Sequence, residues 1–231
     1  MTFCYSCGAL STSREHVPPK CLFPEAKDSL DGIDRRINLI TVPACTEHNL
    51  TKSGDDEYFL YVLSTSITSN EIALAQVQTK LGRAIARRPA LTTSLLEGSK
   101  DCWVRDSATG AVHEATQFAL DGERFSKSLE LVAKGIYFHH FGERWEGKLH
   151  VRADFIDFPH EPNAADIQEA RMALASYADE LFKVEPKHGS NPDVFWYQVH
   201  TPCEGPRCLL RMGFFGGSRA IAFFGELRTR G

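Results

Sequence analysis

The sequence predicts an α+β protein with three parts: a small cysteine-containing module, a helical connector, and an α+β domain with a mainly antiparallel sheet. Residues 1–57 are rich in cysteine, proline and polar residues and contain few apolar runs. Apolar residues then recur at helical spacing up to residue 88, and the last third holds strand-like runs joined by glycine turns. We therefore expect domains at 1–57, 58–100 and 101–231.

The first module has too few apolar residues to bury a core alone, so it needs a staple. Cys4 and Cys7 form a C-x-x-C pair, and Cys45 and His48 form a C-x-x-H pair. Closed zinc sites use four Cys or His ligands, commonly in pairs of this spacing. The spacing predicts a Cys3His zinc site. In one alternative His16 replaces His48, and in another all four are ordinary buried residues.

Between these two pairs lies Glu15-His16, followed by Val17-Pro18-Pro19, which would end a strand. Adjacent residues of a strand point to opposite faces, so the carboxylate could hold a hard cation while the imidazole faces water. Histidine accepts a proton near neutral pH, which is the chemistry of a general base. A surface Glu-His pair without a function is the ordinary alternative.

Two asparagines and a lysine complete the set of polar candidates. Asn49 follows the last proposed zinc ligand at an expected helix start, where its amide oxygen either binds a hard cation or caps the helix. Asn38 precedes the apolar run L-I-T-V, where its side chain either ties down the loop bearing His16 or makes a turn. Lys52, about one helical turn after Asn49, could reach a phosphate.

Residues 4–57 resemble the HNH endonucleases, also called ββα-metal or His-Me finger nucleases. The resemblance is carried by Cys4-x-x-Cys7, Glu15-His16-Val-Pro-Pro, Asn38-Leu and Cys45-x-x-His48-Asn49-x-x-Lys52. It implies a zinc-stapled ββα-metal finger in which His16 is the general base and Asn38 supports its loop. Glu15 and Asn49 would then bind Mg²⁺ or Mn²⁺. This sequence departs from the family pattern twice, with Glu15 where aspartate is usual and His48 in place of a fourth cysteine.

The remaining elements follow from apolar periodicity and turn residues. Ser69-Asn70-Glu71 could begin a helix that ends at Pro89. The other expected elements are a hairpin of 102–105 with 111–114, helices at 125–141 and 164–182, and strands at 149–158, 193–201, 208–215 and 219–227. The last two strands are joined by Gly216-Gly217-Ser218, a typical hairpin turn.

Charge and composition bound the class of partner. The net charge of −4 argues weakly against nucleic acid, since most non-specific DNA binders are basic. Residues 80–105, however, contain six basic and only two acidic side chains. Within this stretch we expect Arg83, Arg87 and Arg88 to contact a phosphate backbone, together with Lys52.

Cysteine usage and hydropathy indicate the compartment. The apolar runs are too short to span a bilayer, and the N-terminus has no secretory signal pattern. The paired C-x-x-C and C-x-x-H spacing favours metal binding in a reducing compartment over disulfides. We therefore expect a cytoplasmic protein that does not engage a membrane.

The expected function is a metal-dependent endonuclease that hydrolyses DNA with one divalent metal ion and a histidine base. The C-terminal domain would recruit substrate, a partner protein, a second copy or a trigger, and the resemblance suggests a setting in bacterial or phage defence. One alternative is a non-catalytic zinc-finger-like module that binds nucleic acid or protein. Another is a nuclease that cleaves RNA. Further clusters, at His139-His140 with His150 and at His200, Cys203 and Cys208, favour packing over metal binding.

Overall fold

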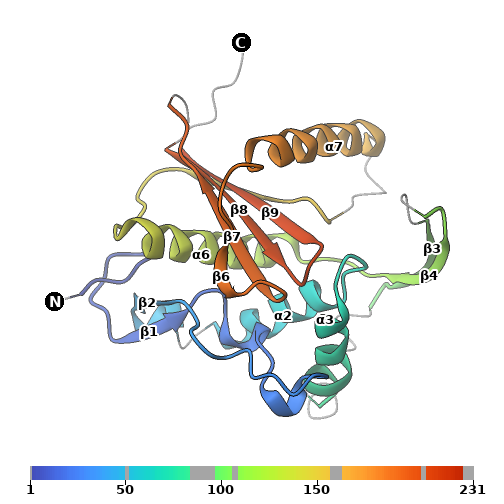
Figure 1. The fold of residues 1–231 in the computed structure, drawn as a ribbon, viewed down its shortest axis with the longest axis horizontal. Coiled ribbons are helices and arrows are strands. Elements are labelled where there is room, and N and C mark those ends of the chain that lie inside the picture. Colours follow the sequence, from blue (N-terminus) through green and yellow to red (C-terminus); the bar gives the residue numbers. More distant parts are fainter. Residues whose placement is uncertain are drawn as a thin grey trace.

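The structure, a computed structural model, describes residues 2–49, 52–83, 97–105, 109–156, 163–203 and 207–225 (Figure 1). It is a mixed α+β protein with a five-stranded antiparallel sheet. The first half contains β1 (Ser13–His16), the short turns η1 (Lys20–Leu22) and η2 (Ala26–Asp28), β2 (Thr41–Ala44), α1 (Thr46–Asn49), α2 (Ser53–Ser64), α3 (Glu71–Gln76) and η3 (Val77–Leu81). The second half contains β3 (Lys100–Arg105), β4 (Val112–Gln117), α6 (Gly122–Phe141), β5 (Leu149–Ala153), α7 (Ala164–Leu181), β6 (His188–Asn191), β7 (Phe195–His200), β8 (Cys208–Phe214) and β9 (Ser218–Phe224).

The N-terminal strands form a short antiparallel hairpin, in which Glu15 lies opposite Val42 and His16 lies opposite Thr41. Strand β1 ends at His16, as the two prolines that follow Val17 predict. The predicted alternation of faces is confirmed, because Glu15 is buried while His16 is only half-buried. The two residues therefore serve different environments.

The described part of the connector is mainly helical, as its apolar spacing predicts. Helix α3 begins at Glu71, and the side chain of Asn70 caps it by accepting a hydrogen bond of 3.2 Å from the backbone N–H of Ala73. Pro89, the predicted end of this helix, lies outside the described residues. Across the described segments, no helix combines the length and the apolar character needed to cross a membrane.

The main sheet has the order β5-β9-β8-β7-β6, and every neighbouring pair is antiparallel. The three strands predicted near the C-terminus are confirmed as β7, β8 and β9, and the predicted hairpin 102–105 with 111–114 as β3 and β4. Strand β5 ends at Ala153, earlier than the predicted 158. Strand β6 has the polar sequence H-G-S-N and was not predicted, because it lacks the apolar alternation of a typical strand.

Helices cover both faces of this sheet (Figure 1). Leu210 and Met212 of β8 point into the larger hydrophobic cluster, which includes α6. Leu209 and Ile221 point the other way and pack with Ala178 and Phe182 at α7. This alternation is what a sheet buried on both sides requires.

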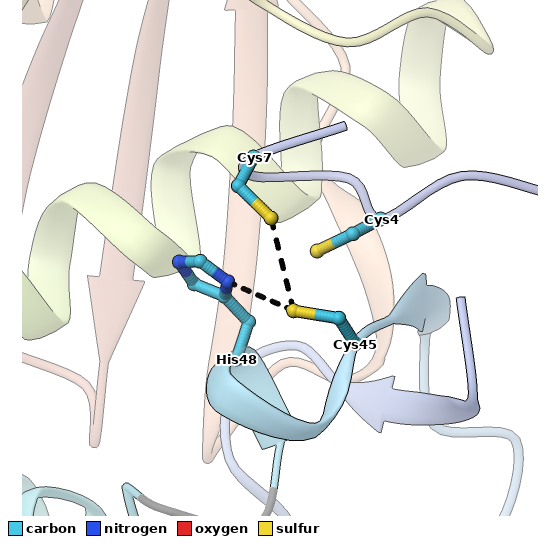
Figure 2. A group of neighbouring side chains, drawn as sticks. All are labelled: Cys4, Cys7, Cys45 and His48. Carbon is cyan, nitrogen blue, oxygen red and sulfur yellow. Dashed lines mark hydrogen bonds between the residues drawn. The ribbon is translucent and has the colours of Figure 1, made fainter. Parts of the chain in front are cut away.

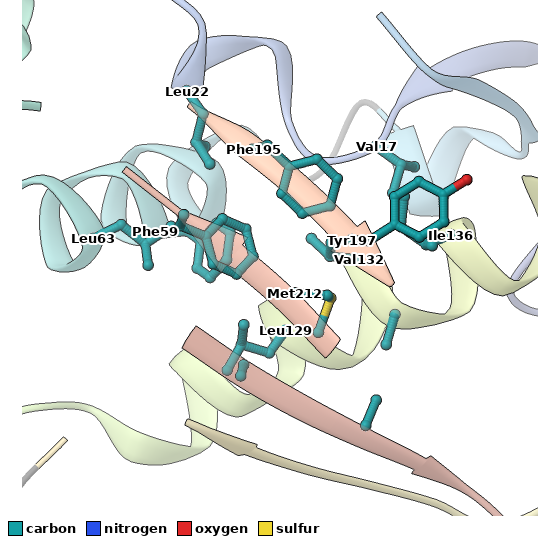
Figure 3. Close-up of a cluster of buried hydrophobic side chains, with 14 of the residues drawn as sticks. Val17, Leu22, Phe59, Leu63, Leu129, Val132, Ile136, Phe195, Tyr197 and Met212 are labelled. Atoms are coloured by element: carbon teal, nitrogen blue, oxygen red, sulfur yellow. The ribbon is translucent and has the colours of Figure 1, made fainter. Parts of the chain in front are cut away.

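The larger cluster joins the N-terminal hairpin to the C-terminal sheet (Figure 3). Val17 and Leu22 from the first segment pack in the same core as Phe59 of α2, Ile136 of α6 and Tyr197 of β7. The segments 1–57 and 101–231 therefore share one core, and the domain boundaries at 57/58 and 100/101 stay predictions.

Candidate functional site

The two Cys/His pairs converge at the open end of the N-terminal hairpin (Figure 2). Cys4 and Cys7 lie in a turn before β1, Cys45 follows β2 directly, and His48 lies in α1. A backbone hydrogen bond of 2.9 Å from Tyr5 N–H to the Pro43 carbonyl fixes that turn against β2. The four ligand atoms all lie within 4.8 Å of one another.

The spacing of these atoms suits a tetrahedral metal ion. The Sγ atoms of Cys7 and Cys45 are 3.7 Å apart, and Cys45 Sγ lies 3.3 Å from His48 Nδ1. Zn–S bonds of about 2.3 Å place two tetrahedral sulfurs about 3.8 Å apart, whereas a disulfide needs about 2.05 Å. The cluster can therefore hold a metal ion such as zinc, with Nδ1 as the imidazole ligand atom.

The chemistry of the Cys4 thiol and the choice of histidine agree with this arrangement. Burial acts to raise the pKa of the Cys4 thiol, but hydrogen bonds from the backbone of Cys7, Cys45 and Ser6 outweigh it and lower that pKa. A lower pKa favours the thiolate, which is the form that binds metal. His48, and not His16, completes the cluster. Among the described residues no second group of three or more Cys, His, Asp or Glu has comparable spacing, including the clusters near His139 and His200.

Glu15 lies on the opposite face of β1 from His16, beneath the start of α2, and is only 5% exposed. Its Oε1 lies 2.8 Å from Nζ of Lys52, which also lies 3.3 Å from Oδ1 of Asp56. Burial raises the pKa of Glu15 and of Asp56, although the Lys52 ammonium opposes the rise. We call Glu15, Lys52 and Asp56 the carboxylate–lysine cluster.

This cluster bears on two predicted roles. A carboxylate oxygen from Glu15 and an amide oxygen from Asn49 are hard donors that suit Mg²⁺ or Mn²⁺. The carboxylate is engaged by the Lys52 ammonium, however, so that lysine must move before a divalent ion can approach Oε1. Lys52, predicted to contact a phosphate, is itself 9% exposed and paired with two carboxylates.

His16, the predicted general base, is half-buried on the other face of β1. Burial lowers the pKa of this imidazole, and the positive charges of Lys20 and Arg36 lower it further. A lowered pKa favours the neutral imidazole, the form that can accept a proton. Since side chains alternate along a strand, His16 shares its face with Arg14 and with Thr41, its partner on β2.

Asn49 was expected at the start of a helix and is instead the last residue of α1. The helix begins right after Cys45 and is a single turn, so the asparagine reaches back toward β1. Its Nδ2 donates hydrogen bonds of 2.7 Å to Ser13 Oγ and 3.3 Å to the Arg14 carbonyl. This contact places the residue after His48 against the strand that bears Glu15 and His16.

Asn38 adopts a left-handed backbone conformation with φ of 56°, which asparagine tolerates better than most residues. Its carbonyl accepts a hydrogen bond of 3.3 Å from Ser190 Oγ of β6. Within the described part of the chain, no hydrogen bond joins its side chain to the loop bearing His16. The backbone thus favours the turn alternative for Asn38.

The predicted phosphate contacts of the connector are only partly visible. Arg83 pairs with the buried carboxylate of Asp28, at 2.9 and 3.0 Å from its two oxygens, while its own side chain is largely exposed. Arg87 and Arg88 lie outside the described residues.

Sequence reasoning missed a polar pocket beside the hairpin, lined by residues that include Arg14, Thr41, His139 and His188. Two signals were present in the sequence. Arg14 lies two residues before His16 and so shares its strand face, and His139 was noted only as part of a helix end.

Comparison of the chain with protein-family models, with curated proteins and with solved structures found no match.

Proposed function

We propose that this protein is a metal-dependent endonuclease that hydrolyses DNA phosphodiester bonds, with zinc at the Cys/His cluster and His16 as general base. The observation that carries the proposal is the hydrogen bond from Asn49 to Ser13. It joins the residue that follows the cluster to the strand bearing Glu15 and His16. The hairpin and α1 therefore form one short unit. This unit carries the Cys/His cluster, the His16 imidazole and the oxygen donors of Glu15 and Asn49.

The chemistry assigned to the chain is proton transfer and positioning. His16 accepts a proton from water, whose oxygen then attacks phosphorus in line with the departing sugar oxygen. A divalent ion held by Glu15 and Asn49 supplies charge stabilisation for the leaving oxygen when bound. Asn49 also holds α1 on β1, so the Cys/His cluster and the imidazole keep a fixed relation.

Lys52 has two assignments within this proposal. Paired with Glu15 and Asp56, it reduces the repulsion between these two carboxylates. If a divalent ion takes over that task, the four-carbon side chain is released to reach a phosphate, its predicted role. Arg83, Arg87 and Arg88 remain predicted contacts for the rest of the backbone.

A second candidate function is a non-catalytic zinc-stapled module that binds nucleic acid or a partner protein. The carboxylate–lysine cluster favours it, because an ion pair already satisfies Glu15 without any added metal. In that case the hairpin serves as a rigid platform, and His16 has no proton to transfer.

Incubation of the purified chain with supercoiled plasmid separates the two candidates. The nuclease proposal predicts relaxed or linear DNA with Mg²⁺ or Mn²⁺, and intact plasmid when no divalent ion is added. Parallel digestion of single-stranded RNA decides between the two nucleic acids. Intact plasmid under every condition, from protein with a normal melting curve and bound zinc, contradicts the proposal and supports the binding module.

The variant His16→Ala tests the catalytic assignment. General base catalysis is worth about 10²–10⁴-fold, so plasmid cleavage should fall by that factor. The matched control is His113→Ala, since His113 is exposed on β4 and far from the hairpin in sequence. Both variants should melt like the wild type, and undiminished cleavage by His16→Ala would remove this histidine from the mechanism.

A further inference from the structure

A polar pocket lies where the N-terminal hairpin meets the end of α6 and the edge strand β6. Its volume is about 470 Å³. Two hydrogen bonds from β6 close one side, from Ser190 Oγ to the Asn38 carbonyl at 3.3 Å and from Asn191 Nδ2 to the Ile37 carbonyl at 3.4 Å. The pocket is therefore formed jointly by the first and last parts of the chain, and neither part contains it alone.

The ionisable groups that face this pocket are of one sign, apart from the phenol of Tyr197. Among the residues that the structure describes, Arg14, His139 and His188 line it, and no aspartate or glutamate does. Asn38, Thr41 and Ser190 add neutral hydrogen-bonding groups. A small cavity that gathers cationic and neutral donors without a carboxylate suits an anion.

Arg14 is the permanently charged member of this group, and the hairpin holds it by three hydrogen bonds. Its Nε and Nη2 donate to Thr41 Oγ1 at 2.9 and 2.7 Å, and Nη2 also donates to the Thr41 carbonyl at 3.0 Å. Among the described residues, no carboxylate pairs with Arg14 and its Nη1 has no hydrogen-bond partner. The guanidinium is thus held in one orientation by the hairpin and keeps its charge for a ligand.

The pocket also lies on the face of the hairpin that carries the proposed base. Arg14 and His16 are two residues apart on β1, and Thr41 is the residue opposite His16 on β2. Side chains with these relations point to one face of a sheet. A ligand that contacts Arg14 and Thr41 therefore approaches from the same side as the His16 imidazole.

We propose that this pocket binds a backbone phosphate of a nucleic-acid strand, adjacent in that strand to the phosphate that is cleaved. The inference rests on the proposed nuclease function and adds to it the residues Arg14, His139 and His188 as substrate contacts. The guanidinium offers Nη1–H, and each imidazole offers an N–H donor even when neutral. The ring of His188, which stacks on the buried Tyr197 ring at 5.0 Å, borders the adjoining sugar or base.

Binding, measured apart from cleavage, tests the inference. The His16→Ala chain is mixed with fluorescent single-stranded and duplex DNA without divalent ions or chelator, so that the Cys/His cluster keeps its metal. Arg14→Met and His139→Gln are added to this background. Their matched controls are Arg152→Met and His150→Gln, two exposed residues of strand β5.

The expected result for Arg14→Met and His139→Gln is a Kd that is weaker by roughly three- to tenfold, the effect of one lost phosphate contact. The slope of log Kd against log salt should also fall by about 1 for Arg14→Met, since one counterion fewer is released. The β5 controls should match the parent. Unchanged affinity and slope in both pocket variants overturns the inference.

Inorganic phosphate supplies the second arm. If the pocket recognises phosphate as such, titration should shift the ring resonances of His139 and His188 and leave those of His150 in place. Shifts with inorganic phosphate but no effect of the pocket variants on DNA binding would assign the pocket to a free phosphorylated molecule and overturn the nucleic-acid assignment. If the pocket variants do not weaken DNA binding while the wild-type chain cleaves plasmid with Mg²⁺, only the pocket assignment is rejected. If the pocket variants weaken DNA binding as expected while the wild-type chain cleaves nothing, only the nuclease function is rejected.

Discussion

The hairpin β1–β2 carries two polar clusters, one of three thiols and an imidazole and one of two carboxylates and an ammonium. At the first, four ligand atoms face each other within 4.8 Å, and none of the four residues carries an ammonium or a guanidinium group. At the second, Glu15 and Asp56 face Lys52, whose Nζ lies 2.8 and 3.3 Å from their oxygens. Both clusters are built to surround positive charge, but only one contains it in the chain itself.

Because of this difference, we expect a metal ion to affect folding at the first cluster and to bind only reversibly at the second. Thiolates brought together without a cation repel each other, so we expect the Cys/His cluster to bind a metal ion. Lys52 already offsets one of the two negative charges of the carboxylate–lysine cluster, so a divalent ion gains there only what exceeds the lost contact with Lys52. Folding should therefore depend on the first cluster, while any catalytic ion should bind weakly and reversibly at the second.

The largest expected effect comes from removing the metal of the Cys/His cluster. Zinc binding in small modules is worth about 10–16 kcal/mol, which is comparable to the whole stability of a domain, about 5–15 kcal/mol. Cys45→Ala should lose bound zinc and unfold the hairpin at room temperature. Zinc content per chain by mass spectrometry, together with a melting curve, measures both consequences.

Cys203→Ala is the matched control, because Cys203 is exposed and lies outside the cluster. It should keep one zinc per chain and the melting temperature of the wild type. A Cys45→Ala protein that melts like this control would show that the cluster is not a staple, and the contrast between the two clusters would be lost.

The Cys/His cluster is also the part of the site that the sequence predicts best. Ligand identity and C-x-x-C spacing are local, so Cys4, Cys7, Cys45 and His48 could be named without knowing the fold. The partner of Glu15 could not, because Lys52 reaches it through the docking of α2 on β1. The role of a charged side chain depends on its neighbours in the tertiary structure, and residue spacing in the sequence does not predict those neighbours.

The same reasoning explains what was found and missed in the fold. Helix α6 and strands β7, β8 and β9 carry strong apolar periodicity and were predicted with nearly their observed bounds. Strand β6 is polar and short, and it forms because its residues His188 and Asn191 pair with β7. The polar pocket includes residues of this strand, so apolar periodicity could not predict the pocket.

The second expected effect concerns Lys52→Met, which removes the cation from the carboxylate–lysine cluster. Breaking a buried pair by removing one partner costs about 3–5 kcal/mol, and the partial exposure of Asp56 brings the expected loss to about 3 kcal/mol. Denaturant unfolding at pH 8 measures it. Lys183→Met is the control, since its pair with Glu180 is exposed and such pairs contribute about 0–1 kcal/mol.

The loss in Lys52→Met should depend on pH in a defined direction. Burial already raises the pKa of Glu15 and Asp56, and without the ammonium nothing opposes that rise. A carboxyl whose pKa is higher in the folded than in the unfolded state binds more protons when folded, so stability increases as pH falls through the folded-state pKa. The deficit should therefore be greatest at pH 8 and shrink toward pH 5.

Added Mg²⁺ sharpens the comparison between the clusters. In Lys52→Met two carboxylates face each other without an internal cation, as the thiols do at the other cluster. Millimolar Mg²⁺ should then raise the melting temperature of this variant more than that of the wild type. If Mg²⁺ raises both melting temperatures equally, or if the stability loss of Lys52→Met does not depend on pH, then Lys52 does not occupy a position that a divalent ion can take.

The smallest expected effect tests whether α6, in addition to the Cys/His cluster, positions the strand that bears His16. Gly135 of α6 packs against Val17, the residue after His16, and a Cβ at Gly135 would lie 2.6 Å from a methyl carbon of Val17. Ala gains up to about 1 kcal/mol over Gly from helix propensity, while overpacking costs about 1–3 kcal/mol. Gly135→Ala should therefore lower the free energy of unfolding by about 1 kcal/mol and leave zinc content unchanged.

A double-mutant cycle with Val17→Ala isolates this contact. Val17→Ala alone removes two buried methyl groups and should destabilise the chain, but in the Gly135→Ala background it also relieves the clash, so the two losses should be less than additive. Additive losses would mean that the helix and the strand adjust independently. A coupled cycle with unchanged zinc would show that the strand bearing His16 is held from both sides, by the Cys/His cluster at its start and by α6 at its end.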